Sequence, residues 1–138
     1  MRISVHAPTI LVPTILMLCC LPAMAQEQPS STAQEKIEIG QGVVCDTLEQ
    51  VERYVALRGN GAETSGALQK VNDEAHLAAC GVALVMFSPG AHVADMTAQG
   101  KLLSIMQINV HAFGNGPVWT KIPRTVRYTV TAEKGQMV

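Results

Sequence analysis

Nucleophilic catalysis depends on residue types that a sequence shows directly. A hydrolytic site needs a serine or cysteine nucleophile, a histidine base and an acid that orients the histidine. The chain has no Gly-x-Ser-x-Gly segment, and neither Ser88 nor Ser104 lies in a recognisable motif. Because such triads assemble in space and not along the sequence, a small periplasmic hydrolase remains an alternative. We assign no catalytic residue and favour a protein without enzymatic activity.

Metal binding is the second chemistry that the residue types allow. The histidines at 76, 92 and 111 are too far apart for a zinc motif, which clusters its ligands. Met86, Met96 and Met106 recur every ten residues, and thioether sulfur suits Cu(I) in an oxidising compartment. A periplasmic copper-handling protein is therefore a further alternative. Core packing explains the methionines more simply, so we assign no metal ligand and expect no cofactor.

Carboxylates and glycines give weaker signals. Asp46 and Glu49 fit the cap and first turn of a helix, where negative charge is favourable. The Gly40-Gln41-Gly42 segment lacks the third glycine and the following helix start of a phosphate-binding loop. A bulge or a close backbone approach explains these two glycines better.

One aromatic residue indicates a binding surface. Trp119 follows the turn Gly114-Asn115-Gly116-Pro117, and tryptophan beside a loop is a favoured contact residue at interfaces. Arg124 and Arg127, on the last strand, could form a small positive strip beside it. The sequence therefore offers Trp119 and Arg127 as a candidate contact surface.

The first 25 residues have the three parts of a cleavable signal peptide. Arg2 supplies the positive charge, residues 10–21 form a short uncharged apolar run, and Ala23-Met24-Ala25 is a small-x-small cleavage site. We expect a periplasmic or secreted protein in which a flexible leader (26–36) precedes a single domain (37–132) and a frayed tail (133–138). No later segment is apolar enough to span a membrane.

Cleavage at Ala25 would leave a chain of 113 residues with nine Lys and Arg against eleven Asp and Glu, a net charge of −2. Without a basic patch, nucleic acid is an unfavourable partner. The two remaining cysteines, Cys45 and Cys80, form an even pair in an exported protein and are predicted to be a disulfide. That bridge would close a loop of about 35 residues, for which chain entropy gives roughly 3–4 kcal/mol of stabilisation.

Hydrophobic periodicity predicts an α+β domain. A first strand over 37–45 is followed by two short helices, one with a capping box at Asp46/Glu49 or Thr47/Gln50 and one from about 63 to 74. An antiparallel meander of about four strands then follows, with a turn at Ser88-Pro89-Gly90, a bulge near Ser104 and a stop at Pro123. The predicted strands of the meander cover residues 76–87, 92–96, 102–113, 119–122 and 125–131.

Two segments resemble small exported proteins of alphaproteobacteria. They are the Val-Val-Cys-Asp-Thr segment at 43–47, which joins a strand to a helix, and the Ala-Cys-Gly-Val-Ala segment at 79–83. Trp119 and the Arg-Tyr-Thr segment at 127–129 fill two further places of that pattern. The resemblance implies a periplasmic setting and supports the disulfide, but the group has no assigned activity and carries over no functional residue.

These observations together predict a non-catalytic binding or accessory module of the envelope. Its partner would be another envelope protein, a glycan or a small ligand.

Overall fold

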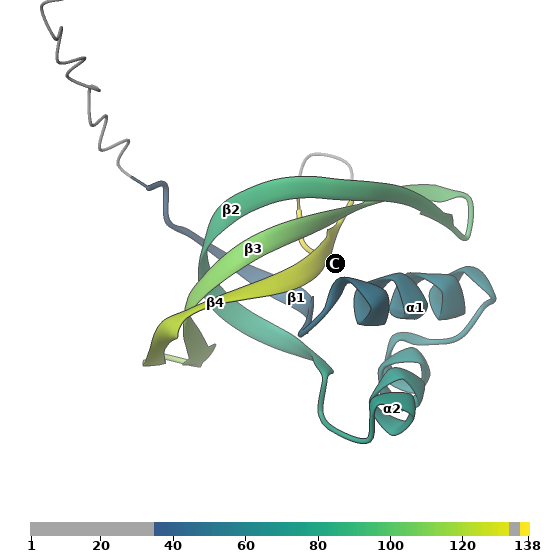
Figure 1. The fold of residues 1–138 in the computed structure, drawn as a ribbon, viewed down its shortest axis with the longest axis horizontal. Coiled ribbons are helices and arrows are strands. Elements are labelled where there is room, and N and C mark those ends of the chain that lie inside the picture. The colour runs from purple at the N-terminus through teal and green to yellow at the C-terminus, as the bar shows by residue number, and fades with distance from the viewer. Residues whose placement is uncertain (1–34, 133–135) are drawn as a thin grey trace, which may run out of the picture. The chain divides into compact units, whose positions relative to one another are not determined.

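The computed structural model describes residues 35–132 and 136–138, which contain four strands and two helices (Figure 1). In chain order the elements are β1 (Glu38–Cys45), α1 (Leu48–Gly59), α2 (Thr64–Ala75), β2 (Cys80–Ala98), β3 (Lys101–Asn115) and β4 (Val118–Thr131). All strand pairs are antiparallel, in the order β1-β2-β3-β4. This is the predicted α+β class.

The later strands are fewer and longer than predicted. Residues 80–87 and 92–96 belong to the single strand β2, which begins at Cys80 and not at the predicted His76, and the two segments around Pro123 form the single strand β4. The predicted turn at Ser88-Pro89-Gly90 is therefore wrong. Proline is tolerated within a strand where the pairing is irregular. Both prolines meet this condition, because the register shifts next to Pro89 and across the part of β4 that contains Pro123.

The predicted bulge near Ser104 is also wrong. Ser104 pairs regularly with Thr131, and the following β3 residues stay in register with β4. Apolar residues occur at both odd and even positions of β3 because both faces of the sheet are covered. Ile105 packs into one core cluster, and Ile108 packs into another on the other face. The actual irregularity of β3 is at His111, which both neighbouring strands skip.

Turn chemistry sets both hairpins. Gln99 and Gly100 have positive φ angles of 51° and 72°, as a two-residue hairpin turn requires, and join β2 to β3. Gly116, with a φ of 61°, makes the predicted turn between β3 and β4.

Helix α1 begins with a capping box, and Thr47 with Gln50 is the pair that forms it. The helix ends at Gly59, and Gly61 then adopts a φ of 89°. Helix α2 ends at Ala75, and its C-cap, His76, adopts the left-handed conformation. Both helices lie together on one side of the curled sheet (Figure 1). Neither has the length and hydrophobicity that a membrane crossing needs.

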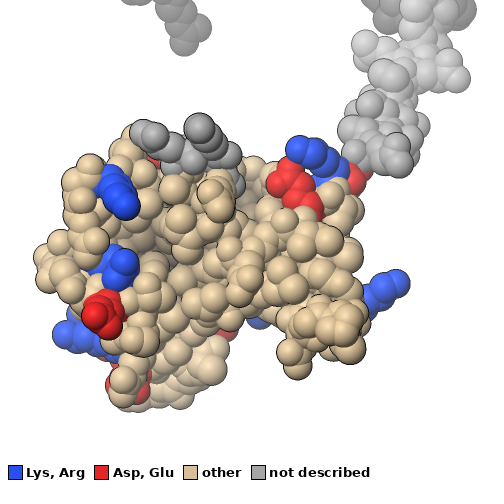
Figure 2. Space-filling model, turned by 180° about the vertical axis from the view of Figure 1, so that it is seen from behind, with Lys and Arg blue, Asp and Glu red and all other residues tan. Residues whose placement is uncertain are grey.

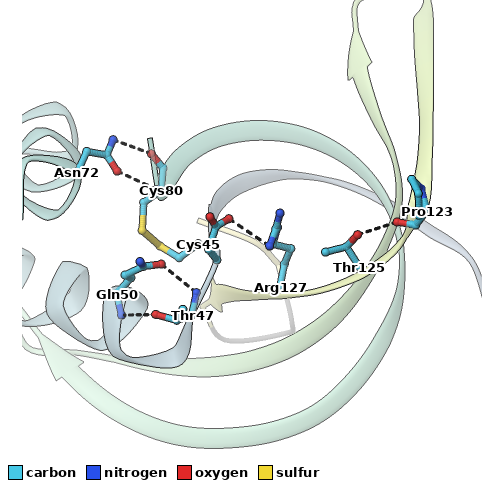
Figure 3. Close-up of polar contacts among 9 residues, drawn as sticks. Cys45, Thr47, Gln50, Asn72, Cys80, Pro123, Thr125 and Arg127 are labelled. Atoms are coloured by element: carbon cyan, nitrogen blue, oxygen red, sulfur yellow. Dashed lines mark hydrogen bonds and ion pairs between the residues drawn. A yellow bond between two sulfur atoms is a disulfide. The ribbon is translucent and has the colours of Figure 1, made fainter. Parts of the chain in front are cut away.

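The Cys45–Cys80 disulfide is present, as predicted (Figure 3). It joins the last residue of β1 to the residue directly opposite, the first of β2, and so closes the loop that carries both helices. Asn72 of α2 adds a second connection, because its side-chain amide donates to the Cys80 carbonyl and accepts from the Cys80 N–H at 2.9 and 2.8 Å. The helices are thus fixed to the strand ends.

The sheet closes on itself through a short contact between β1 and β4, which pairs Val44 with Thr129 and Cys45 with Tyr128. Beyond that contact, Val138 occupies the gap: its carbonyl accepts from Val43, and its N–H donates to Val130. The predicted frayed tail therefore does not describe residues 136–138, which backbone hydrogen bonds hold in place. The predicted signal peptide and most of the leader lie outside the described residues.

The glycines of β1 make room for that tail. A Cβ atom on Gly40 or Gly42 would lie 2.6 or 2.8 Å from the Met137 side chain. The register of β1 with β2 is regular, so close backbone approach, and not a bulge, explains this pair of glycines. Met137 packs there into a core cluster with Val85, Phe87 and Ile108.

Candidate functional site

Trp119 and Arg127 do not share a surface. Trp119 pairs with Gly114, next to the turn between β3 and β4, and Arg127 pairs with Ile108 in the middle of β3. Side chains of directly paired residues point to the same face of a sheet. The pairing places Trp119 on the face of Leu84 and Gln41, and Arg127 on the face of Thr129 and Val44. Because Gln41 and Val44 alternate along β1, these faces are opposite.

The arginines of β4 do not form a free positive strip. Arg127 forms an ion pair with Asp46 beside the disulfide, with 3.2 Å between Nη1 and Oδ1 (Figure 3). Arg124 forms an ion pair with Glu35 at 2.8 Å. Each charge is compensated, so only Trp119 of the predicted contact pair remains on an open surface.

The face that carries Trp119 is mainly apolar beyond the part that the helices cover, although the pairing of Met86 with Ala112 and of Ala112 with Lys121 puts one exposed lysine on it. The pairing β1–β2–β3–β4 places one set of large apolar side chains on it. This set, which we name the Trp119 face, consists of Ile39, Val82, Leu84, Met86 and Trp119, and we add Ile37, which directly precedes β1 and alternates with Glu38. Ile39 is 62% exposed and Val82 is 55% exposed, although both lie on a sheet surface that proteins commonly cover. The side chains thus form one patch and are not scattered singly.

Gly114 allows the centre of this face to pack closely. A Cβ atom at that position would lie 2.7 Å from Leu84 Cδ2 and 3.1 Å from Trp119 Cζ3. The leucine and the indole ring therefore meet above the glycine, which holds the ring of Trp119 half-buried against the sheet. A ring fixed in this way loses little conformational entropy when a partner covers it.

Charged side chains lie at the margins of the domain on the side shown in Figure 2. They gather over the helical part and beside the start of the described chain, a further basic side chain projects at the right-hand edge, and a broad uncharged surface lies between them. Depletion of charge is the compositional mark of the centre of a protein interface.

A polar network borders the Ile37 end of the Trp119 face. The Ser88 hydroxyl donates to Glu35 at 2.5 Å and lies 3.1 Å from Nε2 of His111. Arg124 completes the network on the other side of the carboxylate. The Ser88 hydrogen bond, followed by the charges of Arg124 and His111, holds the pKa of Glu35 below its ordinary value of 4.5.

This network contains serine, histidine and acid, but not in the order that catalysis requires. In a hydrolytic triad the histidine lies between the serine and the acid and takes the serine proton. Here Ser88 lies between the other two and gives its one proton to Glu35, so the His111 nitrogen must be the donor in its contact with Ser88. Ser88 is also 1% exposed. The arrangement is structural and does not activate a nucleophile.

A second serine–histidine–acid group on β2 and β3 has a different order. Asp95 accepts from the Ser104 hydroxyl at 2.6 Å and contacts His92 Nε2 at 2.9 Å. Ser104 first, and His92 second, lower the pKa of this carboxyl from 3.8. With the acid in the middle, the histidine does not reach the serine, so this group is no triad either.

The methionines and histidines considered for copper do not converge. Met86 lies on the Trp119 face, Met96 packs against the core under the helices, and Met106 lines a cavity of about 190 Å³ on the opposite face. Within residues 35–132 and 136–138 no group of three or more His, Cys, Asp or Glu side chains could hold a metal ion. The ten-residue repeat of methionine therefore has no common site.

Sequence reasoning did not identify most of the site. Ile39, Val82 and Leu84 were interpreted as ordinary strand residues, and Glu35 was assigned to the flexible leader. The alternating segment Ile37-Glu38-Ile39 was the available signal, because one of its two faces had to remain uncovered if the helices reached only the far end of β1.

Comparisons with protein-family models, curated proteins and solved structures found no match to this chain.

Proposed function

We propose that this protein is an exported, non-catalytic binding module that docks an apolar surface of another envelope protein on its Trp119 face. The observation that carries the proposal is the set of large apolar side chains that the sheet register brings together and leaves exposed. Apolar side chains, tryptophan and methionine are the residues that interface centres favour. The predicted signal peptide, residues 1–25, would direct the module to the envelope, and its cleavage would release the mature chain.

The chemistry of the face favours a protein over a glycan. A glycan presents many hydroxyl groups and would need hydrogen-bonding side chains across the surface. Gln41 and Lys121 are polar side chains on this face, but its most exposed large side chains, Ile39 and Val82, cannot form hydrogen bonds. Burying each of the exposed β-branched side chains against an apolar partner would contribute about 1.5–3 kcal/mol.

Affinity capture with matched variants tests this proposal. The mature protein, its Trp119→Ala and Ile39→Lys variants and a Leu102→Lys control are used to capture partners from envelope extract. Leu102 is as exposed as the face residues, at 56%, but lies at the other end of β3. We expect the control to recover the wild-type partner and the two face variants to lose it, with a reconstituted affinity at least tenfold weaker.

Recovery of the same partners by all four proteins, or of none by the wild type, would contradict the proposal. The size of the purified wild-type protein in solution supplies a separate check. A dimer that Ile39→Lys dissociates would show that the face binds a second copy of this chain instead.

A further inference from the structure

A cavity of about 260 Å³ lies at the opposite end of β3 from Trp119. Its walls come from α1, the first residue of α2, the turn between β2 and β3, and the end of β4. Leu103 and Val130 provide an apolar wall, and Tyr54, Arg58, Thr64, Gln99 and Lys101 provide the polar groups. The volume is just below the range of small-molecule sites.

Tyr54 supplies a polar group to the cavity wall. The residue is only 5% exposed, and its hydroxyl makes no hydrogen bond to any other described residue. No buried side-chain oxygen or nitrogen among the described residues is unsatisfied, so this hydroxyl is not an orphaned buried group. A tyrosine hydroxyl can donate a hydrogen bond to a ligand in the cavity that the residue lines.

Two cations also line the cavity. Arg53, Arg124 and Arg127 each have a carboxylate within 4.0 Å. Arg58 has none among the described residues, and the same holds for Lys101. No acidic side chain is part of the described lining. The cavity therefore has two positive charges that no described protein group neutralises.

The Arg58 side chain and the turn are held in position before any ligand arrives. Nη1 of Arg58 donates to the carbonyl of Ala62 at 2.7 Å, which leaves its other N–H donors available. Gln99 donates to the main-chain carbonyl of Arg58 at 3.2 Å and so ties the β2–β3 turn to the end of α1. Such pre-ordering lowers the entropy cost of binding.

Helix α2 adds a further favourable group for an anion. Thr64 is its first residue, and the N-cap, Glu63, makes no side-chain hydrogen bond to the first turn. The unpaired N–H groups at a helix start carry partial positive charge and attract anions. Together with the Tyr54 hydroxyl and the two cations, this adds hydrogen-bond donors to the cavity lining.

We propose that this cavity binds a small organic anion, a carboxylate on a short apolar body. Arg58 and Lys101 hold the carboxylate, Tyr54 donates a hydrogen bond to it, and Leu103 and Val130 contact the apolar body. This site is independent of the Trp119 face, so the two proposals stand or fall separately.

Titrations of the mature protein with acetate, butyrate and hexanoate, followed by amide NMR shifts, test the site. We expect shifts at Tyr54, Thr64 and Lys101, with hexanoate binding more tightly than acetate because the apolar wall adds contacts. Inorganic phosphate is a separate arm: tighter binding of phosphate than of hexanoate at these amides would overturn the assignment of a carboxylate ligand.

Variants separate the site from general charge attraction. Arg58→Gln and Lys101→Gln should each weaken hexanoate binding about tenfold, since a hydrogen bond to a charged group contributes about 1.5–3 kcal/mol. Tyr54→Phe should weaken it severalfold. The matched control is Lys121→Gln, which removes an exposed lysine of β4 and should leave the affinity unchanged.

Two results would overturn the proposal: no shift at the cavity residues, or equal hexanoate affinity in Arg58→Gln and Lys121→Gln.

Discussion

At the scale of single residues, hydrogen-bond order decides what a polar cluster can do. Glu35, Ser88 and His111 include the three residue types of a hydrolase, and so do Asp95, His92 and Ser104. In both groups the histidine does not stand between serine and acid, so neither can activate its serine. Residue identity alone would have favoured an enzyme, and geometry removes that support.

The same hydrogen bonds make a pH-dependent prediction. The pKa of Glu35 lies below its ordinary value of 4.5, chiefly because Ser88 donates to the carboxylate. A lowered pKa means that the ionised group stabilises the folded state above pH 4.5, and this stabilisation is lost as the pH falls through the folded pKa. Ser88→Ala should raise the pKa of Glu35 and make the protein less sensitive to acid near that pH.

NMR titrations of the side-chain carboxyl groups in the wild type, in Ser88→Ala and in a control variant measure this effect. Ser104→Ala is the matched control, because it should raise the pKa of Asp95 and leave Glu35 unchanged. A Glu35 pKa that is the same in wild type and Ser88→Ala would show that the hydrogen bond is not its cause.

At the scale of elements, the sequence predicted the class of structure better than its segmentation. The capping box of α1, both hairpin turns and the disulfide follow from local chemistry at Thr47, Gly100, Gly116, Cys45 and Cys80, and all are present. Pro89 and Pro123 were interpreted as strand ends because proline normally stops pairing. Here each falls at a register shift, which depends on the neighbouring strand and could not be seen locally.

The disulfide is the connection between the helices and the sheet. Replacing both Cys45 and Cys80 with alanine frees a loop of about 35 residues and should cost roughly 3–4 kcal/mol of unfolding free energy. Urea unfolding of the wild type and the double variant measures this difference. Thiol titration of the denatured, unreduced wild type should find no free thiol.

A loss below about 1 kcal/mol in the double variant would mean that the Asn72 hydrogen bonds to Cys80 hold the loop without the bridge. Two reactive thiols in the wild type would contradict the disulfide itself.

At the scale of the whole molecule, the site followed from sequence only in part. Trp119 was identified by its residue type and its place beside a turn. Ile39 and Val82 are 43 residues apart and share the surface with it only because the sheet register brings them together. Arg127 was placed beside Trp119 by proximity along the strand, but the irregular middle of β4 and the alternation of side chains put it on the other face. A contact surface whose side chains come from three strands is not a local property of any of them.

The two proposed sites divide the domain. The Trp119 face lies at one end of β3, and the anion cavity at the other end uses α1, α2 and the β2–β3 turn. Binding of a small anion in the cavity could therefore accompany partner binding at the Trp119 face. The proposed function depends on the Trp119 face alone.

Site-specific photo-crosslinking in the exporting cell tests that claim most directly. A photoreactive phenylalanine analogue is placed at position 39, at position 82 or, as the equally exposed control, at position 102. The account predicts that positions 39 and 82 both crosslink to one common envelope protein and that position 102 does not. Absence of a crosslink at 39 and 82, or the same product from all three positions, would contradict it.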